Sequence, residues 1–151
     1  MLSVEVAFLS SDPKRQGVVI FLKTEDDERL LPIQIGFAEA SAIHMKLEGL
    51  ETSRPMTHDL MMNLVETLGG RVESVAVKAI KDGTFYGIIY IERGGETIEV
   101  DSRPSDAIPL ALRADAPIYV HEDVMDEAGI LQSDIQAVQE EQEPNEDFIR
   151  V

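Results

Sequence analysis

The sequence predicts an α+β domain built on a mixed, mostly antiparallel sheet with about three to four packed helices. Three features predict this class: short apolar runs bounded by turn residues, two long strand-like runs joined by Asp82-Gly83, and helical segments that end at glycine. The 151 residues are 44% hydrophobic and 28% charged, which is typical of one globular domain. We expect this domain over residues 1–131 and an acidic, mobile tail over residues 132–151.

The first third of the chain predicts three strands and a helix. The strands are expected over residues 2–9, 17–23 and 29–35, the last two as a hairpin around an acidic turn. Pro32 indicates an edge position or a bulge, because proline donates no hydrogen bond to a strand ladder. Residues 36–49 predict a helix that packs on two sides and ends at Gly49.

A second helix is expected to begin at Thr57, which is a good N-cap residue, and to stop at Gly69-Gly70. Its side chains with helical spacing predict an ordinary core face, formed by Leu60, Met61, Leu64, Val65 and Leu68. Strands then follow over residues 71–81, 84–92 and 96–101.

A third helix, over residues 104–114, is almost wholly apolar, and we expect it to be deeply buried. Pro109 predicts either a late helix start capped by Ser105 or a kink. A short strand over 117–120 and a short helix over 123–128 complete the domain.

The net charge of −16 argues against a protein that coats nucleic acid, because phosphate contacts need Lys and Arg. Residues 122–151 hold ten Asp or Glu against one Arg (net −9), whereas residues 1–121 hold 19 acidic and 12 basic residues (net −7). The main part of the chain is therefore only mildly acidic, and an anionic substrate would need metal ions or local arginines there.

The absence of cysteine excludes disulfides, thiolate zinc sites and cysteine nucleophiles. The first ten residues lack the basic and long apolar regions of a signal peptide. No apolar run approaches the ~20 residues needed to span a bilayer. We therefore expect a cytoplasmic protein without membrane contact.

Two segments, residues 54–59 and 101–106, share one layout: Arg-Pro precedes a helix, and an Asp falls in its first turn. Asp101 also ends a strand. Carboxylates in this arrangement suit a divalent cation such as Mg²⁺, and arginines beside helix N-termini suit phosphate. Metal and phosphate together indicate phosphoester chemistry, with His58 as an acid or base near neutral pH.

A structural interpretation stays open beside the chemical one. Helix dipoles and capping alone favour Asp, Ser and Thr at helix starts. If Arg54 and Arg103 pair with these carboxylates, the result is an ion-pair cluster and no metal site. No phosphate-binding glycine loop, zinc-ligand spacing, nucleophile elbow or dinucleotide fingerprint is present.

Five motifs in consistent order carry a resemblance to a known family. They are LPIQIGFAEASAIHMKLEG (31–49), RPMTHDL (54–60), TFYGIIY (84–90), DSRPSDAIPLALR (101–113) and PIYVHEDV (117–124). Over about residues 2–131 the chain resembles the bifunctional nuclease domain family. The resemblance implies an α+β fold, a homodimer, and nuclease activity on DNA and RNA with a divalent metal, Mg²⁺ or Mn²⁺. The family's polar positions map onto Glu39, Glu48, Arg54, Thr57, His58, Asp59, Asp101, Arg103, Ser105 and Asp106.

The roles that we expect at these positions are our own inference. The metal ligands are Asp59, Asp101 and Asp106; the substrate contacts are Arg54, Thr57, Arg103 and Ser105; the proton-transfer residues are His58 and Glu39. Gly87 and Pro109 depart from the family pattern, in which alanine is expected at both positions. Two alternatives stay open: a non-enzymatic dimeric binding or regulatory module, and a phosphoesterase for a small nucleotide.

Overall fold

The structure, a computed structural model, describes residues 1–12, 17–25 and 28–135. The strands are β1 (Leu2–Asp12), β2 (Gly17–Thr24), β3 (Arg29–Ile35), β4 (Arg71–Lys81), β5 (Thr84–Arg93), β6 (Glu96–Ser102), β7 (Ile118–Val120) and β8 (Ile130–Leu131). The helices are α1 (Phe37–Leu47), α2 (Thr57–Thr67), α3 (Pro104–Ala114) and α4 (Glu122–Ala128). Most of the predicted acidic tail, residues 136–151, lies outside the described residues.

All the strands listed above join one sheet in the order β6-β5-β4-β7-β1-β2-β3-β8. In this sheet, β4 and β7 pair in parallel and the other neighbours pair antiparallel. Helix α4 contacts both β3 and β4, although three strands separate those two in the sheet. The sheet is therefore strongly curved. Its mixed, mostly antiparallel pairing, together with the packed helices, confirms the predicted α+β class.

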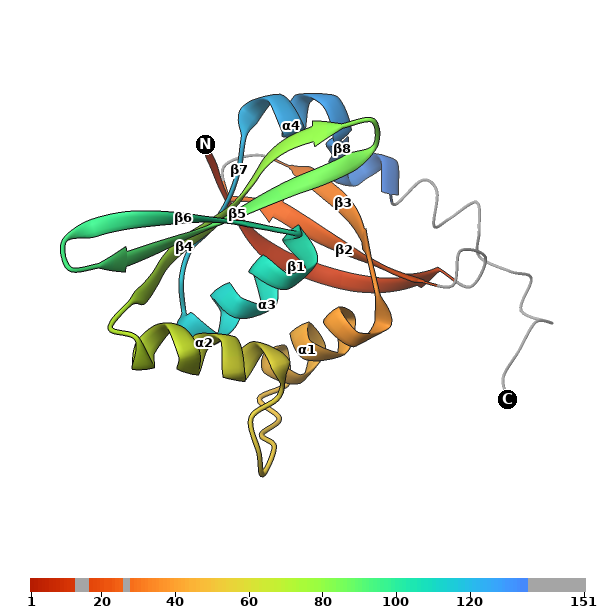
Figure 1. Cartoon of the computed structure of the whole chain (residues 1–151). Helices are drawn as coiled ribbons and strands as arrows, with labels where there is room; N and C mark the ends of the chain where they lie inside the picture. Colours follow the sequence, from red (N-terminus) through yellow and green to blue (C-terminus); the bar gives the residue numbers. More distant parts are fainter. Residues whose placement is uncertain (13–16, 26–27, 136–151) are drawn as a thin grey trace, which may run out of the picture.

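Helices α1, α2 and α3 gather on one side of the curved sheet, and α4 lies at the far end of the domain (Figure 1). Helix α3 is the central one: it contacts α1, α2, β4 and β5. Seven of its eleven residues are buried, which confirms the predicted deep burial. The helix begins at Pro104 and continues through Pro109, so the alternative of a late start at Ser105 is wrong.

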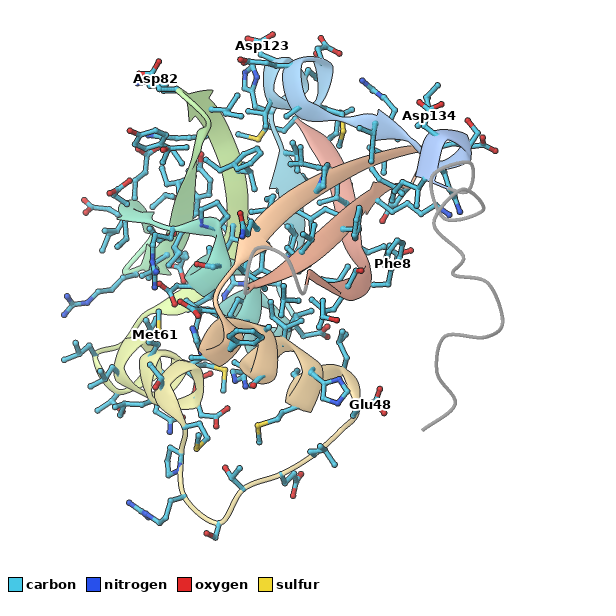
Figure 2. All side chains as sticks on the ribbon, turned by 90° about the vertical axis from the view of Figure 1, so that its right-hand side faces the viewer. Phe8, Glu48, Met61, Asp82, Asp123 and Asp134 are labelled. Atoms are coloured by element: carbon cyan, nitrogen blue, oxygen red, sulfur yellow. The ribbon has the colours of Figure 1, made fainter. Side chains whose placement is uncertain are left out.

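The hydrophobic core lies between the sheet and α3. Fully buried Leu and Ile side chains from four elements meet there, and each contributes about 1.5–3 kcal/mol by leaving water. These residues include Ile20, Leu22, Leu31, Ile43, Ile108 and Leu110. Figure 2 shows side chains filling the space between sheet and helices, and Met61 of α2 packs against this core. No helix of the described part of the chain is both long and apolar enough to cross a membrane.

Three expectations for the helices were wrong. Helix α2 begins one residue earlier than expected, because Met56 takes the extended N-cap position and Thr57, the predicted N-cap, is the first helical residue. The leucines of its expected core face point to solvent: Leu60, Leu64 and Leu68 are 50%, 53% and 65% exposed. Only Met61 and Val65 of that predicted face pack against the core. Helix α1 also buries only Ala40 and Ile43, so it does not pack on two sides.

Gly87 allows the chain to cross closely from β6 into α3. A Cβ atom at this position would lie 3.0 Å from the Ser102 carbonyl oxygen and 3.0 Å from the Pro104 nitrogen, which are both backbone atoms. We expect Gly87→Ala to lower the free energy of unfolding by about 1–2 kcal/mol, since overpacking costs ~1–3 and the substitution recovers ~0.4–1 from the unfolded chain. Urea denaturation measures this change.

The matched control for this prediction is Gly17→Ala. There the nearest atom to a new Cβ, at 3.1 Å, belongs to the flexible Gln34 side chain, which can move aside. Equal losses of stability in the two variants would contradict the proposed backbone crowding at Gly87.

Candidate functional site

A cavity of about 350 Å³ lies where α1, α2 and α3 meet. We call it the central cavity. Five of its polar lining residues come from the first turn or N-cap of a helix: Glu39 from α1, Thr57 and His58 from α2, and Arg103 and Asp106 from α3. Ser41 of α1 and Arg113 of α3 also line it. Because helix N-termini carry partial positive charge, three of them meeting at one cavity favour an anionic ligand.

A chain of polar contacts joins these residues across the cavity. His58 Nε2 lies 3.0 Å from Asp106 Oδ1. Arg103 donates to Asp106 Oδ2 from Nη2 (2.7 Å) and Nε (3.1 Å), and Nη2 also donates to Glu39 Oε1 at 3.1 Å. Asp106 thus accepts from both an imidazole and a guanidinium, while Arg103 bridges two carboxylates.

The ionisation state of Asp106 follows from these partners. Burial raises its pKa, but the hydrogen bonds and charges of Arg103 and His58 together outweigh burial and leave the pKa below its usual value. Asp106 is therefore ionised at neutral pH, and its carboxylate holds a proton on His58 Nε2. The lone pair of the neutral imidazole then lies on Nδ1, the atom that a general base would use.

Beside the central cavity lies a second one of about 370 Å³, which we call the loop cavity because residues 50–55 form much of its wall.

Asp59, in the first turn of α2, links this helix to α3. Its Oδ1 accepts from Arg113 Nε at 2.7 Å and its Oδ2 from the Met56 backbone N–H at 3.0 Å. Arg113 also donates to the Pro109 and Ala42 carbonyl oxygens, so its side chain, 6% exposed, joins α1, α2 and α3.

Acid should weaken the domain through Asp59 and Asp106. The hydrogen bond from the Met56 N–H, with Arg113 opposing the effect of burial, lowers the pKa of Asp59. A carboxyl group with a lowered folded-state pKa contributes stability above its unfolded pKa of about 3.9, and this contribution is lost as pH falls through the folded-state pKa. We expect the unfolding free energy of the wild type to fall below about pH 4 more steeply than that of Asp59→Asn. Urea denaturation from pH 2.5 to 7 measures both slopes, and identical slopes would contradict this linkage.

The structure brings together some of the predicted site residues and separates others. Glu39, Thr57, His58, Arg103 and Asp106 line the central cavity. Arg54 and Asp59 line the loop cavity. Ser105 is buried and lines a third cavity between α3, β3 and the β4–β5 turn. Glu48, at the end of α1, is exposed and lines none of these three cavities.

The three carboxylates predicted as metal ligands do not form one donor set. Asp59 and Asp106 each face an arginine of their own. Helix α3 packs on the sheet face that carries Val100 and Ile89. Asp101 pairs with Ile88, so strand alternation puts its side chain on the other face. Within residues 1–12, 17–25 and 28–135, no group of three or more His, Asp or Glu side chains is placed to hold a metal.

A divalent metal therefore does not fit the residues as they are arranged, because arginine nitrogens already occupy the carboxylate oxygens that would bind it. The dependence on Mg²⁺ or Mn²⁺ stays a prediction.

Arg113 was not predicted as a site residue. This arginine in the last turn of α3 makes three hydrogen bonds and lines both the central and the loop cavity. The signal was a single arginine in an otherwise apolar helix that was expected to be buried. A buried charge needs a partner, so this arginine had to pair with a carboxylate from another element.

The fold and the cavity define an α+β domain with a polar cleft at three helix starts. Over residues 20–133 the sequence matches the family described as the bifunctional nuclease domain. This match covers most of the chain, and the chain belongs to that family. An uncharacterized protein of Mycobacterium tuberculosis is 38% identical over 131 residues, which cover 87% of this chain and 78% of the relative.

More distant relatives come from plants. Bifunctional nuclease 1 of Oryza sativa subsp. japonica is 31% identical over 106 residues, covering 68% of this chain and 32% of the relative. Bifunctional nuclease 2 of Arabidopsis thaliana is 28% identical over 106 residues, covering 68% of this chain and 32% of the relative. The chain thus matches about a third of the length of each plant protein.

Proposed function

We propose that this domain hydrolyses phosphodiester bonds of DNA and RNA in the central cavity. The observation that carries the proposal is the His58–Asp106 pair, an imidazole 3.0 Å from an ionised carboxylate, beside an arginine. A histidine held in one tautomer by a carboxylate is a suitable general base for activating water. The family and its plant members named as nucleases support the same chemistry.

The proposed reaction uses protein groups in defined roles. His58 Nδ1 takes a proton from a water molecule, whose oxygen attacks the phosphorus of the scissile phosphodiester. The bond from phosphorus to the leaving oxygen breaks, and that oxygen takes up a proton from solvent water. Glu39, which lines the same cavity, is the second proposed proton-transfer residue. Arg103 stabilises the charge that develops on the phosphoryl oxygens.

Arg103 has the exposure and the free donors that this role needs. Its side chain is 67% exposed, and its Nη1 makes no hydrogen bond within the part of the chain that the structure describes. A phosphate oxygen can therefore approach Nη1 without displacing Asp106 or Glu39 from Nε and Nη2.

The test is cleavage of labelled single-stranded DNA and RNA oligonucleotides by the purified protein, with Mg²⁺ or Mn²⁺ and with EDTA. We expect both substrates to be cut. Loss of cleavage in EDTA with recovery on adding metal would confirm the predicted metal dependence, whereas undiminished cleavage would assign catalysis to protein groups alone. An inactive wild-type protein would contradict the proposal.

A non-enzymatic binding or regulatory module is the second candidate. It is favoured by the pairing of Asp59 with Arg113 and of Asp106 with Arg103, as in a structural ion-pair cluster. A phosphoesterase for a small nucleotide is the third, because about 350 Å³ lies within the range of small-ligand sites. Hydrolysis of a nucleoside monophosphate but not of an oligonucleotide would favour the phosphoesterase.

We also propose that the chain is a homodimer and that the exposed leucines of α2 form its interface. Leu60, Leu64 and Leu68, at four-residue spacing, make an uncovered apolar stripe. We expect Leu64→Glu to convert a dimer into a monomer, measured by sedimentation equilibrium, because the substitution buries an unpaired charge in the interface. Leu47→Glu, at an equally exposed leucine on α1, is the control and should stay dimeric. A monomeric wild type or a dimeric Leu64→Glu would contradict the assignment.

A further inference from the structure

The loop cavity carries positive charge that the domain's own carboxylates do not neutralise. Lys46 and Arg54 line it and are both exposed. Among the described residues, neither of these two side chains makes an ion pair or a hydrogen bond. The other lining cation, Arg113, is paired with Asp59. In a chain of net charge −16, two unpaired cations in one concave site mark a place for an anion.

Other lining residues of the loop cavity suit an anion that also accepts hydrogen bonds. Ser53 and Asn63 contribute hydroxyl and amide donors, whereas the Thr52 hydroxyl already donates to the Arg54 carbonyl oxygen at 2.6 Å. Its acidic lining residues are Asp59, which Arg113 and the Met56 N–H already satisfy, and Glu51, which is exposed at the loop. Two unpaired cations, Lys46 and Arg54, therefore stand against one carboxylate, Glu51, so the lining of the loop cavity keeps a net positive charge.

The loop cavity adjoins the central cavity, because Met45 and Arg113 line both. A ligand that extends from one cavity into the other passes along α1 and over the Arg113–Asp59 pair. A nucleoside monophosphate has one phosphate, so it cannot place a phosphate in both cavities. A single strand has a phosphate at every nucleotide and can bend into two adjacent cavities, whereas a duplex keeps its bases paired and its backbones apart.

We propose that the loop cavity is a phosphate subsite that binds the backbone of single-stranded nucleic acid next to the phosphodiester in the central cavity. Lys46 and Arg54 make its charged contacts. This inference rests on the proposed function for the position of the scissile bond, and it makes the substrate a polynucleotide strand instead of a mononucleotide.

The test is binding of a fluorescein-labelled eight-nucleotide oligo-dT to the full chain, measured by fluorescence anisotropy in EDTA at several salt concentrations. The cavity variant is Lys46→Glu/Arg54→Glu. The control is Lys78→Glu/Arg93→Glu, which makes the same change in net charge at two exposed cations outside both cavities. The folded state of each variant is checked by thermal unfolding.

We expect the cavity variant to bind at least about tenfold more weakly than the wild type, and the control to bind as the wild type does. The slope of log K against log salt is negative, and it should become less negative by about 1.4 in the cavity variant, at ~0.7 for each of two lost phosphate contacts on a single strand. Equal weakening of binding in the two double variants would overturn the subsite, because the change in net charge alone would then explain the weaker binding.

Failure of the subsite and failure of the proposed function give different results. If the wild type cleaves oligonucleotides but both double variants bind alike, the function stands and the subsite is wrong. If the wild type binds in the expected pattern but cleaves nothing, the subsite stands and the domain is a binding module for single strands. Equal affinity of the wild type for the eight-nucleotide strand and for thymidine monophosphate would also overturn the subsite.

Discussion

His58→Ala is expected to reduce kcat for phosphodiester cleavage by about 10²–10⁴-fold, the usual contribution of a general base. His58 is 5% exposed, its Nε2 lies beside an ionised Asp106, and it is the one histidine among the described residues that line the central cavity. The reduction should fall mainly on kcat, because the base acts in the transition state and Arg103 still holds the phosphate. Single-turnover cleavage of a labelled oligonucleotide measures it.

Because His58 is buried, the substitution also leaves a cavity, and lower stability alone could reduce activity. Added imidazole separates the two effects. A missing base is restored by imidazole that enters the vacated space, whereas a misfolded cavity is not. We expect imidazole to restore part of the activity of His58→Ala, with an optimum pH set by the free imidazole. Activity that is unchanged by the substitution would contradict the assigned role.

Arg113→Met should lower the free energy of unfolding by about 2–4 kcal/mol. Breaking a buried ion pair by removing one partner costs about 3–5 kcal/mol, and Asp59 is one-third exposed, which reduces this loss. Methionine keeps most of the apolar stem, so the loss reports on the bonds from Arg113 to Asp59, Pro109 and Ala42. Urea denaturation measures the change.

The control for this prediction is Arg103→Met, which also removes an arginine that pairs with carboxylates. Arg103 is 67% exposed, and exposed ion pairs contribute only about 0–1 kcal/mol. Burial thus predicts that Arg113 acts mainly on stability and Arg103 mainly on phosphate binding. Similar losses of stability in the two variants would show that burial does not separate these roles.

The fold was predictable where local signals and burial agree. Asp82-Gly83 between two apolar runs predicted the β4–β5 hairpin, and the structure places both residues in left-handed backbone conformations that this turn requires. The apolar run after Arg103 predicted the buried helix α3. These signals depend on nearby residues, and the rest of the chain does not change them.

The orientation of α2 could not be predicted in the same way. Periodicity showed that its apolar residues cover a wide arc, but Met61 and Val65 face the core whereas Leu60, Leu64 and Leu68 do not. The choice between these neighbouring faces depends on how α2 packs against α3 and β4, which is a tertiary property. Exposed leucines of this kind also arise where a second chain covers them.

The candidate site was only partly predictable. The shared Arg-Pro layout correctly placed Arg103 and Asp106 beside the start of α3, and His58 meets them there. The same layout suggested that Asp101 joins Asp106, but the end of β6 puts the two carboxylates on opposite sides of the sheet. Pairing between distant segments, such as Arg113 with Asp59 or Arg103 with Glu39, has no local sequence signal.

One measurement tests the central claim most directly: cleavage of a single-stranded oligonucleotide by the wild type, Asp106→Asn and Asp101→Asn. If the reaction takes place at the His58–Asp106 pair, the wild type cleaves, Asp106→Asn loses at least about 100-fold in kcat, and Asp101→Asn stays active. Equal loss in both variants would favour a site that needs the two carboxylates together. An inactive wild type, or full activity in Asp106→Asn, would contradict the assignment of the central cavity as a nuclease site.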